Sequence, residues 1–155
     1  MKTPHVYDKG KYHIDSIIES GYDEGQEYVH TALYITWLIE NDMIADELID
    51  GIEDYINSVK NHETTGMYFY KEIGDGGLDE YMLTNTGNEF SLYYFDLAKG
   101  KYIYDYQKAF NVGSGNQSFS VKDSIENYEK IKPYIDKAFI KWKKRKNKKF
   151  WEIWK

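Results

Sequence analysis

The chain has 155 residues, which is enough for one domain with its own hydrophobic core, and no cysteine, which excludes disulfides and cysteine-based zinc sites. Its net charge is −6 at pH 7, and its longest apolar run, "ALYITWLI", is too short to span a bilayer, so we expect no membrane partner. Residues 1–15 contain no apolar segment of the kind found in signal peptides, and we therefore expect a cytoplasmic protein.

The charges are distributed unevenly along the chain. Residues 141–155 hold eight Lys and Arg and one Glu, a net charge of +7, so residues 1–140 carry −13. Such an asymmetry bears on partners and solubility rather than on the fold. We expect the acidic body to repel phosphates, which makes nucleic acid an improbable partner in spite of the basic tail.

Two helices are predicted in the first half of the chain. Residues 26–41 place apolar side chains on more than one helical face, which indicates a central helix. Residues 46–60 carry an apolar stripe at helical spacing, with acidic side chains on the opposite face. Gly51 lies within this second pattern and costs about 1 kcal/mol relative to Ala, but we expect one continuous helix.

The middle of the chain is less regular. Residues 62–73 fit a helix, with a small β element near 67–70 as the alternative. We then expect a glycine turn, a short helix near 78–83, a helix that begins around Phe90 and ends at Gly100, and another helix from Tyr102 to Phe110.

The last helix has the clearest start signal. Asp123 and Glu126 form an Asp-x-x-Glu pattern similar to a capping box, and an apolar stripe follows as far as Trp142. Pro133 predicts a kink or break near Lys132. The whole pattern predicts an all-α fold, with residues 1–155 forming one compact domain of about six or seven helices and a basic, aromatic tail at 141–155.

Candidate residues for chemistry are few. His30 lies on the predicted central helix, where a histidine is usually a hydrogen-bonded core or boundary residue. The alternative is a ligand or acid–base group shared with Asp8 and His13, which requires the N-terminal segment to pack over that helix. We identify no catalytic residue and no cofactor motif, so this trio is only a weak candidate for a metal site.

The stretch "GDGGLDE" resembles a calcium or phosphate loop, but it lacks the calcium-ligand spacing and the Gly-Lys-Ser/Thr of a P-loop. Carboxylates at helical spacing are usually solvated, yet they are also the groups that would steer a basic partner. The candidates for partner binding are Asp50, Glu53, Asp54, Asp75, Asp79 and Glu80.

Three stretches together carry a family resemblance: "YDKGKYHID", "EYVHTALYITWLIENDMI" and "VKDSIENYEKIKPYIDKAFIKWK". They resemble a bacterial domain-of-unknown-function family whose members begin with Tyr-Asp and Trp-His, continue with a helical His, and end with Asn-Tyr, Lys-Pro and Trp-Lys. The matching positions here include Tyr7 and Asp8, His13 (after Tyr12, where the family often has Trp) and His30. The segment after His13 departs from the family pattern. The resemblance implies no established reaction.

Two functional hypotheses follow. The first is a non-enzymatic, acidic binding protein: an immunity protein, or antitoxin, that neutralises a cognate bacterial toxin such as a nuclease, whose basic cleft would complement the acidic body. The alternative is a metal-dependent or hydrolytic enzyme centred on Asp8, His13 and His30. For the tail, we expect Phe150, Trp151 and Trp154 to fold back onto the acidic body as an intramolecular clasp.

Overall fold

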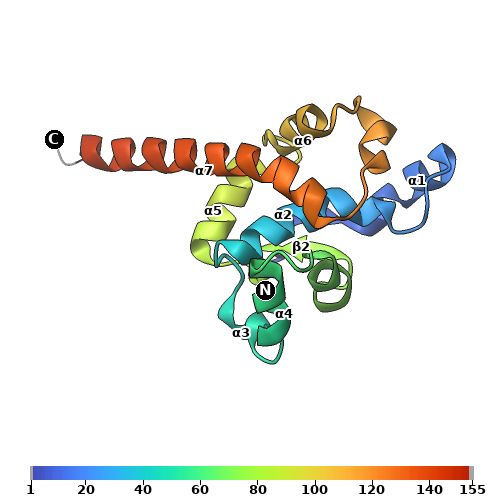
Figure 1. The fold of residues 1–155 in the computed structure, drawn as a ribbon. Helices are drawn as coiled ribbons and strands as arrows, with labels where there is room; N and C mark the ends of the chain where they lie inside the picture. The colour runs from blue at the N-terminus through green and yellow to red at the C-terminus, as the bar shows by residue number, and fades with distance from the viewer. Residues whose placement is uncertain (1, 154–155) are drawn as a thin grey trace.

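We describe the fold from a computed structural model of the chain, in which residues 2–153 are placed. Helices dominate, and a two-stranded antiparallel sheet is the minor β element (Figure 1). This confirms the predicted all-α class.

The strands are β1 (Val6–Lys9) and β2 (Gly77–Asp79). The α-helices are α1 (Ile14–Ser20), α2 (Val29–Glu40), α3 (Asp46–Ile49), α4 (Glu53–Lys60), α5 (Asn85–Tyr94), α6 (Tyr102–Phe110) and α7 (Ile125–Ile153). Shorter helical segments are η1 (Gly10–His13), η2 (Gln26–Tyr28), η3 (Phe69–Ile73), η4 (Glu80–Met82) and η5 (Gly115–Ser120).

Helix α2 is the centre of the fold, as its sequence predicts. Every residue from Val29 to Ile39 is buried, because apolar side chains surround the helix and each face meets a neighbouring element. Helices α4 and α7 and the segment η3 all pack against it (Figure 1). At its second turn the chain entering η3 comes so close that a Cβ at Gly66 would lie 2.9 Å from the Ala32 carbonyl oxygen, which explains a glycine there.

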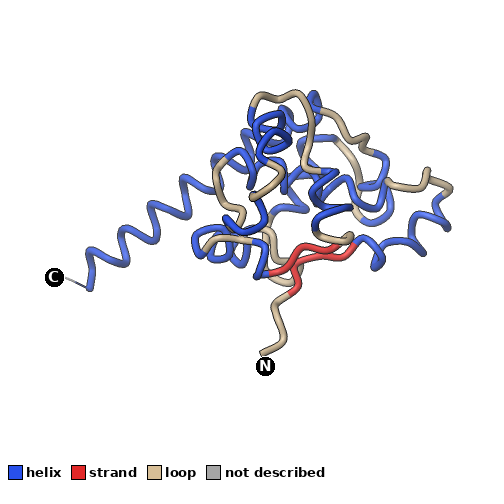
Figure 2. Tube along the Cα trace, turned by 90° about the horizontal axis from the view of Figure 1, so that it is seen from below, coloured by secondary structure: helices blue, strands red, loops and turns tan. Residues whose placement is uncertain are grey.

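The β element lies at 6–9 and 77–79, and the alternative location near 67–70 is wrong. Residues 67–73 are helical, ending in the π-type turn η3, and both Phe69 and Tyr70 are fully buried there. The two strands pair with Asp8 opposite Leu78 and Lys9 opposite Gly77 (Figure 2). The sheet therefore holds the N-terminal segment against the rest of the molecule.

The predicted helix over 46–60 is divided in two. Helix α3 ends at Ile49 and α4 begins at Glu53, because Gly51 adopts a φ of +86°, which no right-handed helix contains. Ile56 and Val59 still face the core. The apolar spacing therefore predicted the buried residues correctly but did not predict the turn at Gly51.

Two other boundaries differ from the prediction. Residues 78–83 contain the end of β2 and the single turn η4 instead of an α-helix. The helix expected to end at Gly100 instead spans Asn85–Tyr94, and the Thr84 side chain caps it by accepting from the Gly87 N–H. The helix at Tyr102–Phe110 is confirmed.

The last helix begins one residue later than its sequence signal predicts. The Asn127 N–H donates to Ser124 Oγ, whereas Asp123 Oδ1 accepts a hydrogen bond from Thr65 Oγ1 at 2.7 Å. Ser124 is therefore the capping residue, and Asp123 ties the start of α7 to the loop before η3. Pro133 lies inside α7 without ending it.

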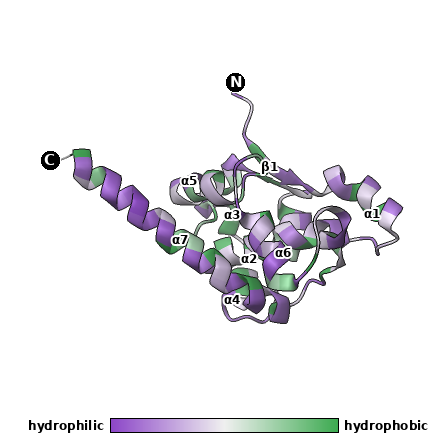
Figure 3. Ribbon diagram, turned by 90° about the horizontal axis from the view of Figure 1, so that it is seen from above, coloured by the Kyte–Doolittle hydropathy of each residue, from purple (hydrophilic) through white to green (hydrophobic). Residues whose placement is uncertain are grey.

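The second half of α7 projects from the body as a hydrophilic arm (Figures 1 and 3). The predicted clasp is wrong for its described residues, because Phe150 and Trp151 are 61% and 71% exposed; Trp154 lies outside the described residues. Trp142, by contrast, packs on Phe90 and Phe139. Although α7 is long, no helix within residues 2–153 is both long and apolar enough to cross a membrane.

These contacts predict opposite outcomes for two tryptophans of the same helix. Trp142→Ala should lower the free energy of unfolding by about 2 kcal/mol, less than the cost of truncating a fully buried tryptophan, because one edge of the ring is already solvated. Trp151→Ala should change it by less than about 0.5 kcal/mol. Thermal or urea unfolding of both variants would measure this, and a destabilised Trp151→Ala would show that the arm docks after all.

Candidate functional site

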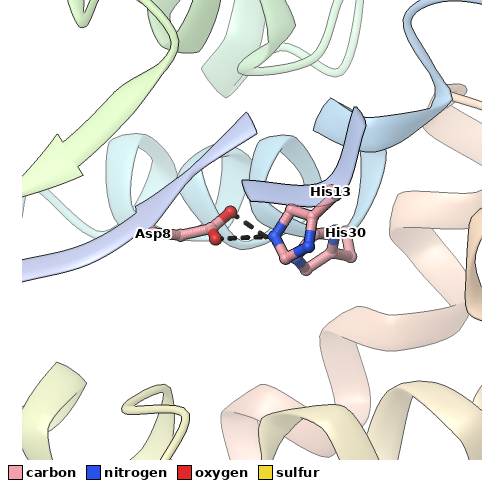
Figure 4. Close-up of side chains that lie close together, drawn as sticks. All are labelled: Asp8, His13 and His30. Atoms are coloured by element: carbon pink, nitrogen blue, oxygen red, sulfur yellow. Dashed lines mark hydrogen bonds and ion pairs between the residues drawn. The ribbon is translucent and has the colours of Figure 1, made fainter. Parts of the chain in front are cut away.

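The structure brings together the three residues that the sequence identified as a weak metal candidate. Asp8 lies on β1, His13 at the end of η1, and His30 in the first turn of α2 (Figure 4). The pairing of β1 with β2 and the turn of η1 carry the N-terminal segment over α2, which is the arrangement the hypothesis required. One potential ligand atom from each residue lies within 4.8 Å of the others.

Asp8 is the centre of this cluster. His13 Nε2 donates to its Oδ1 at 2.8 Å, and His30 Nε2 lies 3.5 Å from its Oδ2 (Figure 4). The hydroxyl groups of Thr31 and Tyr70 donate to Oδ2 at 2.6 and 2.8 Å. The side chain of Asp8 is fully buried, whereas His13 remains 19% exposed. The site therefore reaches the surface along one edge of His13.

The surroundings of Asp8 and His30 favour the charged form of the carboxyl group and the neutral form of the imidazole. Burial by itself raises the pKa of Asp8. The hydrogen bond from His13, the electrostatic attraction of the His30 and His13 rings, and the hydrogen bond from Thr31 together outweigh it and lower the pKa from 3.8 to about 2. Burial lowers the pKa of His30 from 6.5 to about 4, against the attraction of the Asp8 charge. At neutral pH the site thus contains a carboxylate and a neutral imidazole, the forms that bind a metal ion.

Two buried polar atoms beside the cluster have no hydrogen-bond partner: His30 Nδ1 and the hydroxyl oxygen of Tyr106. The two rings are neighbours, with centroids 6.4 Å apart, and Phe119 packs against both histidines. A buried polar atom without a partner is unusual and calls for a specific explanation, such as a bound water molecule or ion.

The donor set fits a divalent metal ion. Two ligands at about 2.1 Å from a tetrahedral zinc ion lie about 3.4 Å apart, and the His13–Asp8 and His30–Asp8 separations of 2.8 and 3.5 Å bracket that value. The hydroxyl groups of Thr31 and Tyr70, which donate to Asp8 Oδ2, would then hold the carboxylate in place.

Sequence reasoning missed the partners of the trio. Thr31 follows His30 directly and could have been suspected, because adjacent helical residues reach neighbouring parts of one site. Tyr70, Tyr106 and Phe119 carry no local signal that distinguishes them from the many other aromatic residues of the chain. Only the packing of η3, α6 and η5 around α2 brings them to the site.

The model of DUF7832, a domain of unknown function, matches residues 6–121. The chain belongs to this family. No curated protein and no solved structure matches it. Asp8, His13 and His30 all lie inside the DUF7832 domain, as do Thr31 and Tyr70, whereas the whole of α7 lies beyond the matched range.

The six acidic candidates for partner binding fall into two groups on the surface of the DUF7832 domain. Asp50, Glu53 and Asp54 are exposed at the turn between α3 and α4. The others surround β2 and are partly engaged: Asp79 accepts from the Tyr81 N–H, and Glu80 accepts from the His5 N–H, while Asp75 is exposed. The first group is therefore the freer to meet a partner.

The pKa shifts predict how the metal-free DUF7832 protein responds to acid. Between pH 6.5 and 4 the unfolded chain binds a proton at His30 that the folded protein does not, so the free energy of unfolding should fall by on the order of 3 kcal/mol. Between pH 4 and 2 protonation of Asp8 should remove a further contribution on the order of 2 kcal/mol.

Urea unfolding in EDTA at several pH values would measure both steps. Asp8→Asn should start less stable and should lack the contribution between pH 4 and 2. A wild-type stability that stays constant from pH 6.5 to 4 would contradict the assignment of a buried neutral His30.

Proposed function

We propose that Asp8, His13 and His30 bind a divalent transition-metal ion of the zinc class, and that this ion is the functional group of the domain. The observation that carries the proposal is the convergence of one carboxylate and two imidazoles from three separate elements, next to a buried His30 Nδ1 that has no partner. Two imidazoles and a carboxylate suit zinc and iron(II) better than magnesium or calcium, which prefer oxygen ligands alone.

The residues of the chain have distinct parts in this site. Asp8 supplies the negative charge, and Thr31 and Tyr70 fix its orientation through Oδ2. His30 is held in place by burial, and the Tyr102 hydroxyl donates to its backbone carbonyl at 2.5 Å. His13 closes the site on its exposed side and is the ligand best placed to move as an ion enters.

Three protein ligands leave a further coordination position, and an ion bound in this way can activate a water molecule for hydrolysis. The partial exposure of His13 supports access of a small molecule along that edge. This supports a metal-dependent, hydrolytic activity over a purely structural site, in which all positions are filled by the protein.

Cobalt titration of untagged, EDTA-treated protein tests the metal proposal. One Co²⁺ per chain should bind with the absorption of a low-symmetry site, and zinc should displace it. His13→Ala and His30→Ala should lose this binding. Thr31→Val, which removes a hydroxyl that orients the Asp8 carboxylate, should weaken it by about 10- to 100-fold. Binding should weaken as the pH falls towards 4, because burial lowers the pKa of His30 to about 4 and a protonated imidazole cannot act as a ligand.

The matched control is His62→Ala, which removes a half-buried histidine that faces Glu40 and Glu129 instead of the site. Its cobalt affinity should equal that of the wild type. Circular dichroism would establish that each variant is folded. The proposal fails if the folded wild type takes up no stoichiometric metal, or if His62→Ala loses as much affinity as His13→Ala.

A second candidate function is that of a cytoplasmic immunity protein, an antitoxin that neutralises a cognate toxin. It is supported by an acidic, aromatic surface: Glu53 and Asp54 line a hollow together with Tyr55 and Tyr68, which is 48% exposed, and Asp50 is exposed next to the lining residue Gly51. Tyrosines of this kind often anchor protein interfaces, while the carboxylates would steer a basic partner such as a nuclease. The absence of cysteine from the chain is consistent with a reducing compartment.

Charge reversal at this surface tests the second function. Asp50→Lys/Glu53→Lys/Asp54→Lys should abolish protection of cells from the toxin encoded beside the gene, and should raise the dissociation constant of the complex by about 100-fold or more. Asp15→Lys/Glu19→Lys on the exposed face of α1 is the control and should protect normally. If deleting the gene is harmless and no neighbouring product binds, the immunity function is excluded.

A further inference from the structure

A second cavity is lined by residues of a different kind from those of the metal candidate. It has a volume of about 450 Å³, within the range of small-molecule sites, and lies between α5, α6 and α7. None of the residues that line it belongs to the Asp8 cluster. Part of its wall comes from α7, which lies beyond the family match.

The cavity concentrates positive charge on an acidic protein. The chain has a net charge of −6, yet six cationic side chains and a single carboxylate, Asp105, line this cavity. The carboxylate already accepts a hydrogen bond from the Tyr94 hydroxyl at 2.7 Å. The cations are Lys99, Lys101, Lys108, Lys137, Lys141 and Arg145.

These cations have no anionic partner among the described residues. The ion pairs within residues 2–153 involve other lysines, such as Lys60 with Asp42 and Lys132 with Asp136. Like charges that converge around a hollow repel one another, and a bound anion removes that cost while gaining several charge-assisted hydrogen bonds. The arrangement therefore favours a ligand with several negative charges.

Apolar and aromatic side chains also line the cavity. Tyr93 and Tyr134 line it together with Ala138, and the Arg145 guanidinium lies 5.8 Å from the centre of the Tyr93 ring. Exposed tyrosine faces beside cations stack on planar rings, as they do on the bases of nucleotides. A simple inorganic anion would leave this surface unused.

We infer that this cavity binds a nucleoside polyphosphate, with the phosphates on the lysines of α6 and α7 and the base against Tyr93 and Tyr134. Lys137, Lys141 and Arg145 recur every four residues along α7, so they present one row of positive charge to the phosphates. This site shares no residue with the metal site, so the inference does not depend on the metal proposal.

Calorimetry with ATP tests this inference in EDTA, which keeps the result separate from metal binding. One ATP should bind per chain, and binding should weaken as salt is raised, as expected for contacts to phosphate. Lys137→Glu/Lys141→Glu should weaken it by about 100-fold or more, since each lost charge-assisted contact is worth on the order of ten-fold in affinity. Inorganic tripolyphosphate should bind more weakly than ATP, because it has no ring to stack.

The control is Lys143→Glu/Lys144→Glu, which makes the same charge change on the same helix at residues that do not line the cavity. It should retain ATP affinity to within a few-fold. Absence of ATP binding, or equal losses in both double variants, overturns the inference. So do equal affinities for tripolyphosphate and ATP, or much tighter binding of single-stranded DNA, which would point to an inorganic anion or a nucleic-acid surface instead.

Discussion

The carboxylate of Asp8 is charged and fully buried, and the arrangement of the N-terminal half depends on how that charge is accommodated. An unpaired buried charge would cost several kcal/mol, so the protein surrounds it with donors. They come from η1, α2 and η3, three segments far apart in the sequence, through His13, Thr31 and Tyr70. Forming the cluster and packing these segments on α2 are consequently the same event.

Buried tyrosine hydroxyl groups in the rest of the core also have hydrogen-bond partners. Tyr34 bonds to Ser91, Tyr94 to Asp105 and Tyr128 to Glu40, so large rings fill the space around α2 while each polar tip finds a partner. Burial raises the pKa of all three, which keeps these hydroxyls protonated and able to donate. Tyr106 is the exception among them, and its unpartnered hydroxyl marks the wall of the Asp8 site.

Charge is segregated by structure as well as by sequence. The acidic side chains of α3 and α4 are exposed, while α7 carries lysines from the wall of the basic cavity out along the projecting arm. The metal candidate lies within the DUF7832 match, and the α7 wall of the basic cavity does not. The two proposed sites share no residue and can therefore be tested apart.

The sequence alone determined the helical class and the burial of α2, because an apolar pattern on all faces of one helix leaves it no stable place except the centre. It also put Asp8, His13 and His30 forward as a weak metal candidate, since the chain has only four histidines and His30 lies on the predicted central helix. Tertiary structure decided the rest. The chain turns at Gly51, where the apolar spacing predicted one continuous helix. The positive φ of this residue depends on what the flanking helices α3 and α4 must pack against. The exposed arm replaced the expected clasp because α7 continues as one helix to Ile153 and carries its second half away from the body (Figure 1), where Phe150 and Trp151 remain mostly exposed. The convergence of the trio required β1 to pair with β2, a contact between residues some 70 positions apart that local sequence does not encode.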